Sequence, residues 1–479
     1  MNAQNIFDGI TDIRDDLIDG AKEAPKKRKR WGKKRWLGSV AAVLAVAILA
    51  GIFLRPGGEL TAYAAYAIAE AEYPEMAPYP GEPHTKAAYD AWWESMIAQQ
   101  RDLGDISALE SFFAQSARTF LTGDEGQNRV YSPLNVYMAL SMLAQLTDGE
   151  SRGQILDLLG SDSMDALRRQ ASDVWNANYR DDGALTSVLA SSLWLDQDVT
   201  FHQDTMDILA RDFYASSYQG EMGSKEFDKL LQSWLNQQTG GLLKEQAGNI
   251  ELDRDTVLAL ATTVYFKAKW YTEFSKRNTF PETFHAPDGD VETNFMHQQD
   301  DDTYYWGSKF AAVGQYFEEG RGSTMWFLLP DEGIAPEELL SDGEAMDFLF
   351  TDQRNGWENH KYLIVNKSIP KFDVSSQFDL TEGLQSLGVT DVFDPALSDF
   401  TPMTTDVDVP ITVSQADHAA RVVIDEEGCT AAAFTVMLYA GAAPPPDEEV
   451  DFVLDRPFIF CITGESGLPL FVGIVNHLG

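Results

Sequence analysis

The spacing of hydrophobic residues changes from a helical period in the first half of the chain to strand-like runs in the second. Apolar residues recur every three to four positions in residues 106–120, 136–143 and 227–234, and again in 380–387, as they do on one face of a helix. Strand-like runs rich in β-branched and aromatic residues are found at residues 257–266, 325–329, 362–365, 409–413, 421–424, 457–462 and 468–475. Helices followed by strands predict an α+β fold with large, mostly antiparallel sheets.

This core pattern continues from about residue 105 to residue 479 without a linker or an internal repeat. We therefore predict one domain in residues 105–479 rather than two. The preceding stretch, residues 55–104, is interrupted by several prolines and ends in a possible helix that contains Trp92 and Trp93. We interpret it as a spacer followed by a lead-in helix.

A separate apolar segment lies near the N-terminus. Residues 36–54 carry no charge, and as a helix they would span roughly 28 Å, about the thickness of the hydrocarbon core of a bilayer. Most of the ten basic residues of the tail, residues 1–35, lie directly before this run, so the positive-inside rule places the tail in the cytoplasm and the main body outside. A signal peptide cleaved near residues 62–64 is the alternative. The long head and the long apolar run favour a retained transmembrane anchor.

The overall charge excludes several classes of function. The chain has 36 basic and 75 acidic residues and a formal net charge of −39, which argues against a nucleic-acid partner. Two cysteines exclude a disulfide scaffold, and seven scattered histidines without an HExxH motif make a zinc hydrolase a poor fit. We predict neither a metal nor another cofactor. The body after residue 35 is strongly anionic, which would speed encounter with cationic partners.

One motif matches a known catalytic pattern. Residues 149–153 read G-x-S-x-G, the nucleophile elbow of serine hydrolases, with Ser151 at its centre. The elbow requires a strand before the serine, but the preceding residues 136–146 have helical spacing. A hydrolase that uses Ser151 is therefore kept only as a minor alternative.

The segment of residues 424–449 has an unusual order of residue types. A strand ends at an acidic, glycine-containing hinge, and a small-residue segment, an apolar segment and a Pro-rich acidic stretch follow. Read with a period of two, Cys429, Ala431, Ala433 and Thr435 share one face and are all small. A strand with that face could slide between two existing strands without a clash. From these residues alone, an Ala-rich helix followed by a linker is an equal alternative.

From about residue 105 onward the sequence resembles the serpin family of serine protease inhibitors. The order and spacing of several motifs carry this resemblance, and it covers some 370 residues. The matching motifs are residues 128–133 (NRVYSP), 265–270 (YFKAKW), 369–372 (IPKF), 387–393 (LGVTDVF), 399–400 (DF), 452–460 (FVLDRPFIF) and 470–476 (LFVGIVN). The resemblance implies a serpin-like fold with a large mixed, mostly antiparallel central sheet, further sheets and about eight to nine helices.

The resemblance also implies that residues 426–451 form an exposed reactive-centre loop. In serpins a protease attacks this loop, and the acylated loop inserts as an extra strand, drags the protease along and distorts its active site. The hinge of the loop would comprise Glu426, Glu427, Gly428, Cys429, Thr430, Ala431, Ala432, Ala433 and Thr435. Cys429 and Phe434 depart from the usual residue types, but Cys429 is small and Phe434 lies on the other face. Cys429 in an exposed hinge would be sensitive to oxidation.

In inhibitory serpins, the residue before the cleaved bond usually lies sixteen positions after the first glutamate of the hinge. Counted from Glu426, this places the reactive bond at Ala442–Ala443. A small residue there suits elastase-like or subtilisin-like proteases. A shift of one residue, to Gly441–Ala442, stays open, and cleavage after Leu438 or Tyr439 would instead indicate a chymotrypsin-like target.

Serpins also have residues beneath the central sheet that hold its strands together, called the shutter, and a tryptophan at the opening where the loop enters, called the breach. The matching breach residue is Trp270. The matching shutter residues are Ser132, Asn135, Thr262 and His418. Asn135 stands where a serine is usual and Thr262 where an asparagine is usual, and we expect them to share a hydrogen-bond cluster.

The main hypothesis is a monomeric, membrane-anchored bacterial serpin that faces outward and inhibits serine proteases with small-residue specificity. The single apolar helix is its contact with the membrane, and no enzymatic activity is expected. A serpin fold used for binding or signalling, without inhibition, is the principal alternative.

Overall fold

A computed structural model of the chain describes residues 62–81, 83–123, 126–318, 322–351, 356–404, 406, 411–413, 416–429, 446 and 448–478. Residues 63–479 form one compact unit, so residues 63–104 belong to the same body as the residues that follow them. Within the described residues, no helix combines the length and the apolar character that crossing a bilayer requires. The apolar run of residues 36–54 lies outside them.

Eleven α-helices lie in the described residues, and α10 and α11 have only four residues each. The longer helices are therefore close in number to the eight or nine expected. The bounds are α3 Lys86–Gln99, α4 Ser107–Leu121, α5 Pro133–Leu146, α6 Gly149–Leu158, α7 Met164–Asn178, α8 Gln203–Asp212, α9 Lys225–Gln238, α10 Lys244–Ala247, α11 Pro336–Leu339, α12 Gly343–Phe350 and α13 Thr381–Ser386. Three short 3-10 helices, η1 Ala62–Tyr66, η2 Lys276–Asn278 and η4 Asp391–Phe393, are also present.

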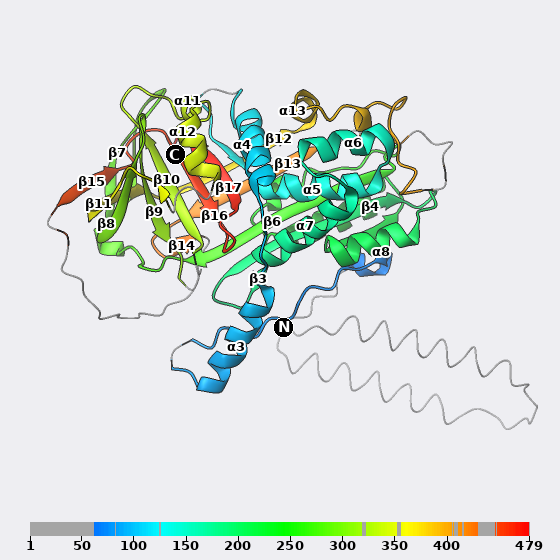
Figure 1. The fold of residues 1–479 in the computed structure, drawn as a ribbon, viewed down its shortest axis with the longest axis horizontal. Helices are drawn as coiled ribbons and strands as arrows, with labels where there is room; N and C mark the ends of the chain where they lie inside the picture. The colour runs from blue at the N-terminus through cyan, green and yellow to red at the C-terminus, as the bar shows by residue number, and fades with distance from the viewer. Residues whose placement is uncertain are drawn as a thin grey trace, which may run out of the picture. The chain divides into compact units, whose positions relative to one another are not determined.

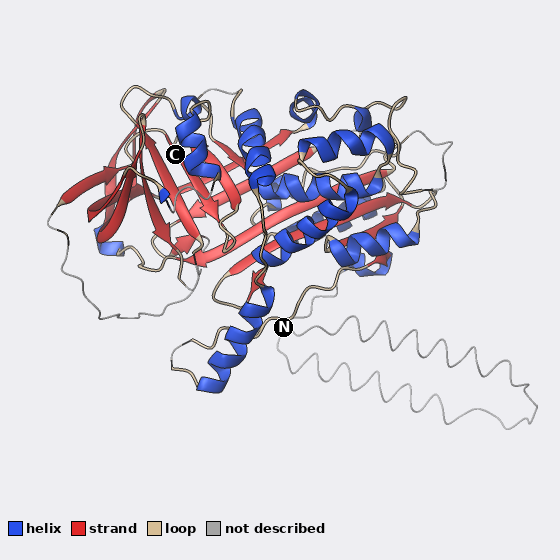
Figure 2. Cartoon of the chain, in the orientation of Figure 1, coloured by secondary structure: helices blue, strands red, loops and turns tan. Residues whose placement is uncertain are grey.

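The first sheet has the strand order β1-β5-β4-β6-β14-β13-β12, with β3 paired to β4. Its bounds are β1 Ala67–Ala69, β3 Arg180–Asp181, β4 Thr186–Asp196, β5 Ala215–Gly220, β6 Leu258–Lys269, β12 Phe372–Asp379, β13 Asp417–Ile424 and β14 Gly428–Cys429. Only β4 and β5 pair in parallel; the other recorded pairs are antiparallel. Helices α5, α7 and α8 lie across one face of this sheet (Figure 1, Figure 2).

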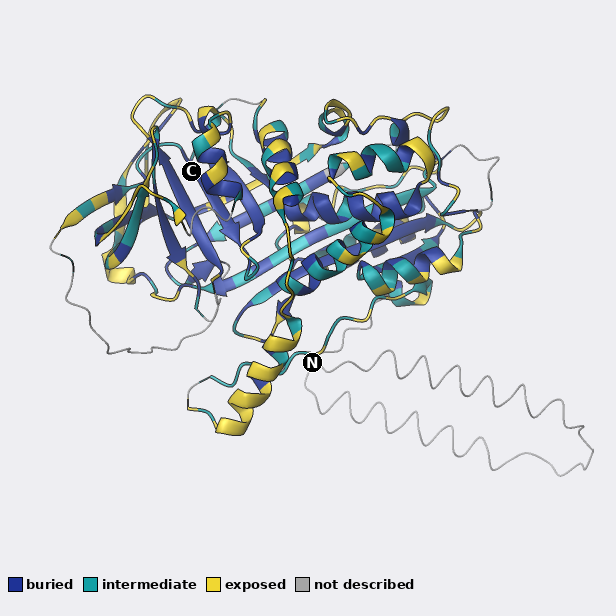
Figure 3. Ribbon diagram, in the orientation of Figure 1, coloured by how far each residue is buried: buried dark blue, intermediate teal, exposed yellow. Residues whose placement is uncertain are grey.

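The second sheet has the order β15-β11-β8-β9-β10-β16-β17-β2, with β7 paired to β8. Its bounds are β2 Arg129–Tyr131, β7 Thr279–Ala286, β8 Gly289–Trp306, β9 Phe310–Tyr316, β10 Thr324–Pro330, β11 His360–Pro370, β15 Glu449–Val453, β16 Phe458–Thr463 and β17 Pro469–Val475. Strands β16 and β17 are buried along their whole length, and the interior strands are correspondingly dark in Figure 3.

The α+β fold with large, mostly antiparallel sheets is therefore confirmed. Six of the seven predicted strand runs lie within or overlap observed strands, β6, β10, β11, β13, β16 and β17. The run at 409–413 was wrong in its described part, because residues 411–413 are not in a strand. The sequence pattern also missed β4 and β5 in the first half. Strand β4 is buried on both faces and so lacks clear alternation, and β5 (residues 215–220) is short and mostly polar in sequence.

Candidate functional site

The candidate site begins at a tight turn that joins β13 to β14. The Asp425 amide donates to the Gly428 carbonyl at 3.0 Å. The Asp425 carboxylate accepts from the amides of Glu427 and Gly428 at 2.9 and 3.3 Å, as aspartate often does at the start of a turn. The chain therefore reverses within four residues and enters the first sheet as β14.

Strand β14 lies between β6 and β13. Gly428 pairs with Lys269, and Cys429 pairs with Ala268 on one side and Ile424 on the other. A Cβ on Gly428 would lie 2.2 Å from the Ala268 carbonyl oxygen, so only glycine fits between these backbones. Cys429 is 3% exposed, which corrects the expectation that it lies in an exposed, oxidation-sensitive hinge.

Beyond these two residues, the described part of the chain has no strand between β6 and β13, and we call this place in the sheet the gap. Strand β14 runs antiparallel to both neighbours, so β6 and β13 are parallel to each other and one strand apart. In the described part of the chain, the two share no backbone pairing: β6 pairs with β4 and β14, and β13 pairs with β12 and β14. The register of β14 is one in which a longer antiparallel strand could continue along both facing edges.

Two lysines hold the turn in place, and no feature of the sequence pointed to their role. Lys371 pairs with Glu426 at 2.7 Å, and Lys276 pairs with Glu427 at 2.6 Å. Burial, the largest single influence, raises the pKa of the Glu426 carboxyl. The hydrogen bond and charge of Lys371, together with hydrogen bonds from its own backbone amide and from Thr279, outweigh it, so the pKa lies below the ordinary value. Glu426 is thus held ionised at the head of the gap.

Trp270, the predicted breach residue, lies against this turn. Its indole donates to the Asp425 carbonyl at 2.8 Å, and its backbone amide donates to the Glu427 carbonyl at 3.1 Å. The ring is 1% exposed and stacks on Phe317 with centroids 4.9 Å apart. Trp270 therefore supports the point where the chain enters the sheet.

The four predicted shutter residues come together at the start of α5. The Ser132 amide donates to His418 Nε2 at 3.2 Å, and the Ser132 hydroxyl donates to the Leu470 carbonyl at 2.6 Å. The Asn135 side chain donates to the backbone carbonyl of Thr262 at 3.2 Å. Since His418 is on β13 and Thr262 is on β6, the first turn of α5 links the two strands that flank the gap.

His418 is fully buried between the rings of Tyr131 and Phe378, with centroids 5.4 and 5.3 Å from the imidazole. Burial lowers the pKa of His418 to about 4. The ring is therefore neutral near pH 7, as its role as an acceptor for the Ser132 amide requires.

A further contact reaches β13 from the segment after α9. The Arg421 guanidinium donates to the Leu242 carbonyl at 3.0 Å and forms two bonds with Asp373 on β12. Helix α9 itself packs on β4 and β6. The connection after α9 thus joins the two sides of the gap at a second place.

The G-x-S-x-G motif does not have the geometry of a nucleophile elbow. A helix, α5, precedes it, and Ser151 lies in the first turn of α6. Ser151 is 0% exposed, and its hydroxyl accepts the Asp399 amide at 3.1 Å. Its role in this fold is to tie α6 to the loop around Asp399.

The remaining predicted site residues lie outside the described part of the chain: Thr430, Ala431, Ala432, Ala433, Thr435, Gly441, Ala442 and Ala443. The segment starts at β14 in the first sheet, and the chain re-enters the second sheet at β15, which pairs in parallel with β11. Among the described residues, no three His, Cys, Asp or Glu side chains are arranged to hold a metal ion.

Comparisons with known proteins agree with this geometry. Residues 107–478 match the model of the family described as serpin, serine protease inhibitor. Serpin-Z10 of Arabidopsis thaliana is 30% identical over 367 residues, which cover 73% of this chain and 91% of that protein. Alpha-1-antiproteinase 2 of Equus caballus is 27% identical over 357 residues, which cover 73% of this chain and 81% of that protein.

Solved structures with the same fold include native serpins. The native state of the thermophilic serpin tengpin aligns with a TM-score of 0.70 and 25% identity, covering 79% of this chain and 96% of tengpin. The native stressed conformation of an Arabidopsis serpin aligns with a TM-score of 0.65 and 26% identity, covering 79% of this chain and 99% of that one. Residues 62–106 precede the part that the family model matches.

Proposed function

The chain belongs to the serpin family, a family of protease inhibitors, and we propose that it traps serine proteases at the outer face of a bacterial cell membrane. In this proposal a protease attacks the loop that follows β14 and forms an acyl-enzyme. The loop then fills the gap between β6 and β13 before the acyl bond is hydrolysed, and the attached protease is displaced and distorted.

The observation that carries the proposal is the one-strand gap with β14 at its head. If the register Cys429 to Ala268 continues, Ala431 comes opposite Phe266, Ala433 opposite Val264 and Thr435 opposite Thr262. Side chains opposite each other in a strand pair point to the same face, so these small residues would meet the core beneath the sheet. Phe434 would point to the other face.

Filling the gap also supplies the driving force. Both edges of the new strand would gain backbone hydrogen bonds, each contributing about 0.5–1.5 kcal/mol net. Over the eight residues of β13, this amounts to about 10 kcal/mol. A native state that lacks this strand is therefore metastable with respect to the inserted state.

The proposed reactive bond is Ala442–Ala443, with Gly441–Ala442 as the alternative. A small side chain before the scissile bond suits the shallow primary pocket of elastase-like and subtilisin-like proteases. The proposed membrane display rests on the uncharged run of residues 36–54 and on the basic residues before it.

Incubation of the full chain in detergent micelles with pancreatic elastase, followed by denaturing gel electrophoresis, tests the inhibitory function. We expect a covalent complex that survives denaturation, and N-terminal sequencing of the released C-terminal fragment should start at Ala443. The matched control is Ala433→Arg, which places a long charged side chain on the face that must enter the core. We expect this variant to be cleaved without complex formation.

Cleavage of the unaltered chain without any complex would instead support a non-inhibitory serpin. Hydrolysis of small esters that is lost in Ser151→Ala would support the hydrolase alternative.

A further inference from the structure

Helix α3 presents an apolar face that the fold leaves exposed. Only Trp92 and Met96 of its 14 residues are buried. Tyr89, Trp93 and Ile97 are 36%, 39% and 43% exposed and are spaced four residues apart, so they share one face of the helix. In Figure 3, α3 is the helix with the most extensive exposed surface. We call these three residues the α3 stripe.

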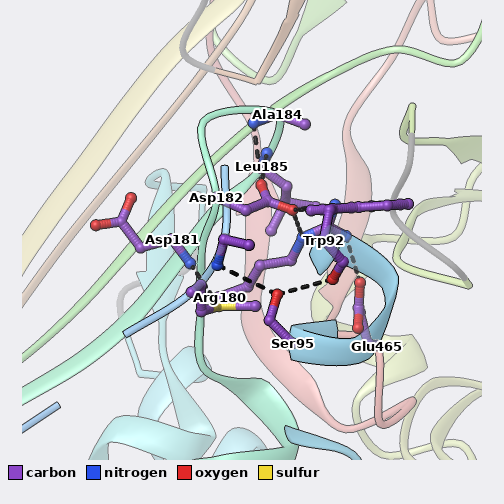
Figure 4. Close-up of polar contacts among 10 residues, drawn as sticks. Trp92, Ser95, Arg180, Asp181, Asp182, Ala184, Leu185 and Glu465 are labelled. Carbon is purple, nitrogen blue, oxygen red and sulfur yellow. Dashed lines mark hydrogen bonds and ion pairs between the residues drawn. The ribbon is translucent and has the colours of Figure 1, made fainter. Parts of the chain in front are cut away.

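The helix is nevertheless fixed rigidly to the domain. The Trp92 indole donates to the Asp182 carboxylate at 2.7 Å, and the other oxygen of Asp182 accepts the amides of Ala184 and Leu185 at 3.0 Å each (Figure 4). Arg180 is 2% exposed and forms ion pairs with Asp182 and Glu465. A buried ionic cluster thus holds α3 at a set angle, so the stripe is presented by a rigid support.

The chain reaches α3 along the edge of the first sheet. Strand β1 pairs with β5, and the Tyr73 ring packs against Trp175, Tyr179 and Tyr214. The Tyr79 amide then donates to the Asp182 carbonyl at 2.7 Å. The start of this path is joined to the uncharged run of residues 36–54 by only seven residues, 55–61. Seven extended residues span at most about 25 Å, so an anchored chain keeps this sheet edge close to the bilayer.

We propose that the α3 stripe contacts the interfacial layer of the bilayer that holds the chain's own anchor. The inference rests on the membrane display proposed above. Trp and Tyr favour the headgroup region, where an apolar ring and a polar atom are both satisfied, and Ile97 adds apolar surface. Lys86 and Asp90, beside the stripe, pair with each other at 2.7 Å. The exposed Glu94 lies about 60° around the helix from Ile97, on the side away from the buried Trp92 and Met96, so its carboxylate can stay in water while the stripe contacts the headgroups.

This contact would fix the orientation of the domain relative to the bilayer, whereas the anchor keeps the domain at the membrane. The anchor already supplies a high effective concentration of lipid, so a small apolar surface is enough to select one orientation. Strand β3, at the base of α3, pairs with β4, β4 pairs with β6, and β6 pairs with β14 through Ala268 and Cys429. The base of α3 is therefore three strands away from the start of the reactive loop. Two attachment points would therefore hold the start of the reactive loop at a fixed height above the bilayer.

The test uses the full chain reconstituted in phosphatidylcholine nanodiscs. An environment-sensitive NBD label is placed at residue 93 by Trp93→Cys, and quenching by lipids with a shallow doxyl group is measured. The matched control is Ala91→Cys, which is exposed on the same helix about 160° around from residue 93. Cys429 and Cys461 are buried, and the unsubstituted chain checks that they do not react. A second variant adds Tyr89→Ser and Ile97→Ser to the label at residue 93.

We expect quenching at residue 93 to exceed that at residue 91 at least threefold, and to fall to the level of residue 91 in the second variant. Equal quenching at both positions, or none at residue 93 in a chain that co-purifies with nanodiscs, overturns the contact and leaves the anchor intact. A chain that does not incorporate into nanodiscs overturns both. A blue shift at residue 93 that grows with protein concentration without lipid assigns the stripe to a second copy and overturns the proposal.

Discussion

At the scale of single residues, the start of α5 is hydrogen-bonded to both strands that flank the gap. Ser132 holds His418 of β13, and Asn135 holds the Thr262 carbonyl of β6. In the proposed inserted register, Thr435 would come opposite Thr262, so the Asn135 bond lies where the new strand must form. The Asn135 amide therefore links α5 to β6 at this point.

Asn135→Ala should make premature insertion easier. Loss of the Asn135–Thr262 hydrogen bond should cost the native state about 1 kcal/mol, because a buried carbonyl loses its donor. We expect a melting temperature lowered by a few degrees and faster accumulation of latent or polymeric protein on warming, followed by native gel electrophoresis. Asn249→Ala, which removes an exposed amide bond to the Glu245 carbonyl, is the matched control. An unchanged melting temperature with no gain in either form would contradict the role of Asn135.

His418 predicts a pH dependence of stability. Its pKa is about 4 in the folded chain against an ordinary 6.5, so the unfolded chain binds more protons between these values. The contribution of neutral His418 to the free energy of unfolding is fully present above pH 6.5 and is lost as the pH falls toward 4. Between pH 8 and pH 5, this contribution lowers the free energy of unfolding by about 2 kcal/mol.

This contribution can be isolated by comparing the pH dependence of the urea midpoint in the unaltered chain and in His418→Gln. The glutamine can still accept the Ser132 amide but does not titrate. The variant should show a shallower loss between pH 7 and pH 5; identical slopes would mean that His418 is not the group responsible.

At the scale of elements, β14 is a strand of two residues that pairs with both β6 and β13. A longer strand in the same register would complete the pairing of these two neighbours. Strand β14 depends on Gly428, because the Ala268 carbonyl and the Lys269 backbone approach too closely for any side chain. It also depends on Lys371 and Lys276, which fix the acidic turn from outside the sheet. In the proposed mechanism, β14 would be the first part of the inserted strand.

Gly428→Ala should expel β14 from the sheet. The added methyl group would lie against backbone atoms, which cannot move aside as a flexible side chain can. We expect faster hydrogen exchange at the Cys429 amide and at neighbouring amides of β6, and a shift from complex formation toward simple cleavage by elastase. Gly343→Ala, where a Cβ has open space, is the control and should behave like the unaltered chain. Unchanged exchange in Gly428→Ala would show that the site tolerates a side chain.

At the scale of the whole molecule, the gap divides the first sheet into two parts held together by few contacts. One part is β1-β5-β4-β6 and the other is β13-β12. Among the described residues, the contacts that bridge them include β14, the bonds of Trp270 to the turn after β13, the start of α5 and the Arg421–Leu242 bond. The proposed energy store is therefore a property of the sheet as a whole, since no single residue holds it.

Cleavage of the loop within residues 430–445 should raise the melting temperature. A nicked loop is free to pair with both β6 and β13, and the gain of about 10 kcal/mol corresponds to a rise of roughly 10 °C or more in a domain of this size. Calorimetry or circular dichroism of the intact and nicked chains measures the difference. If both forms melt at the same temperature, the gap stores no usable energy and the trapping mechanism fails.

Local pattern could predict a good part of this fold. Helical period located α4, α5, α9 and α13, and the strand runs located most of the later strands. The pattern failed for β4, which is buried at nine consecutive positions, because a strand covered on both faces shows no alternation. It also missed α12 and the β7–β8 hairpin, which are defined chiefly by what they pack against.

The sequence by itself determined which faces are apolar, where the small residues of the loop alternate, and which family the motifs resemble, because these properties are local or depend on spacing. Only the tertiary structure decided that Cys429 is buried, that Lys371 meets Glu426, and that Arg180 meets Glu465 285 residues away. Such pairings depend on which surfaces meet once the sheets close, and a one-dimensional pattern does not encode that choice of neighbours.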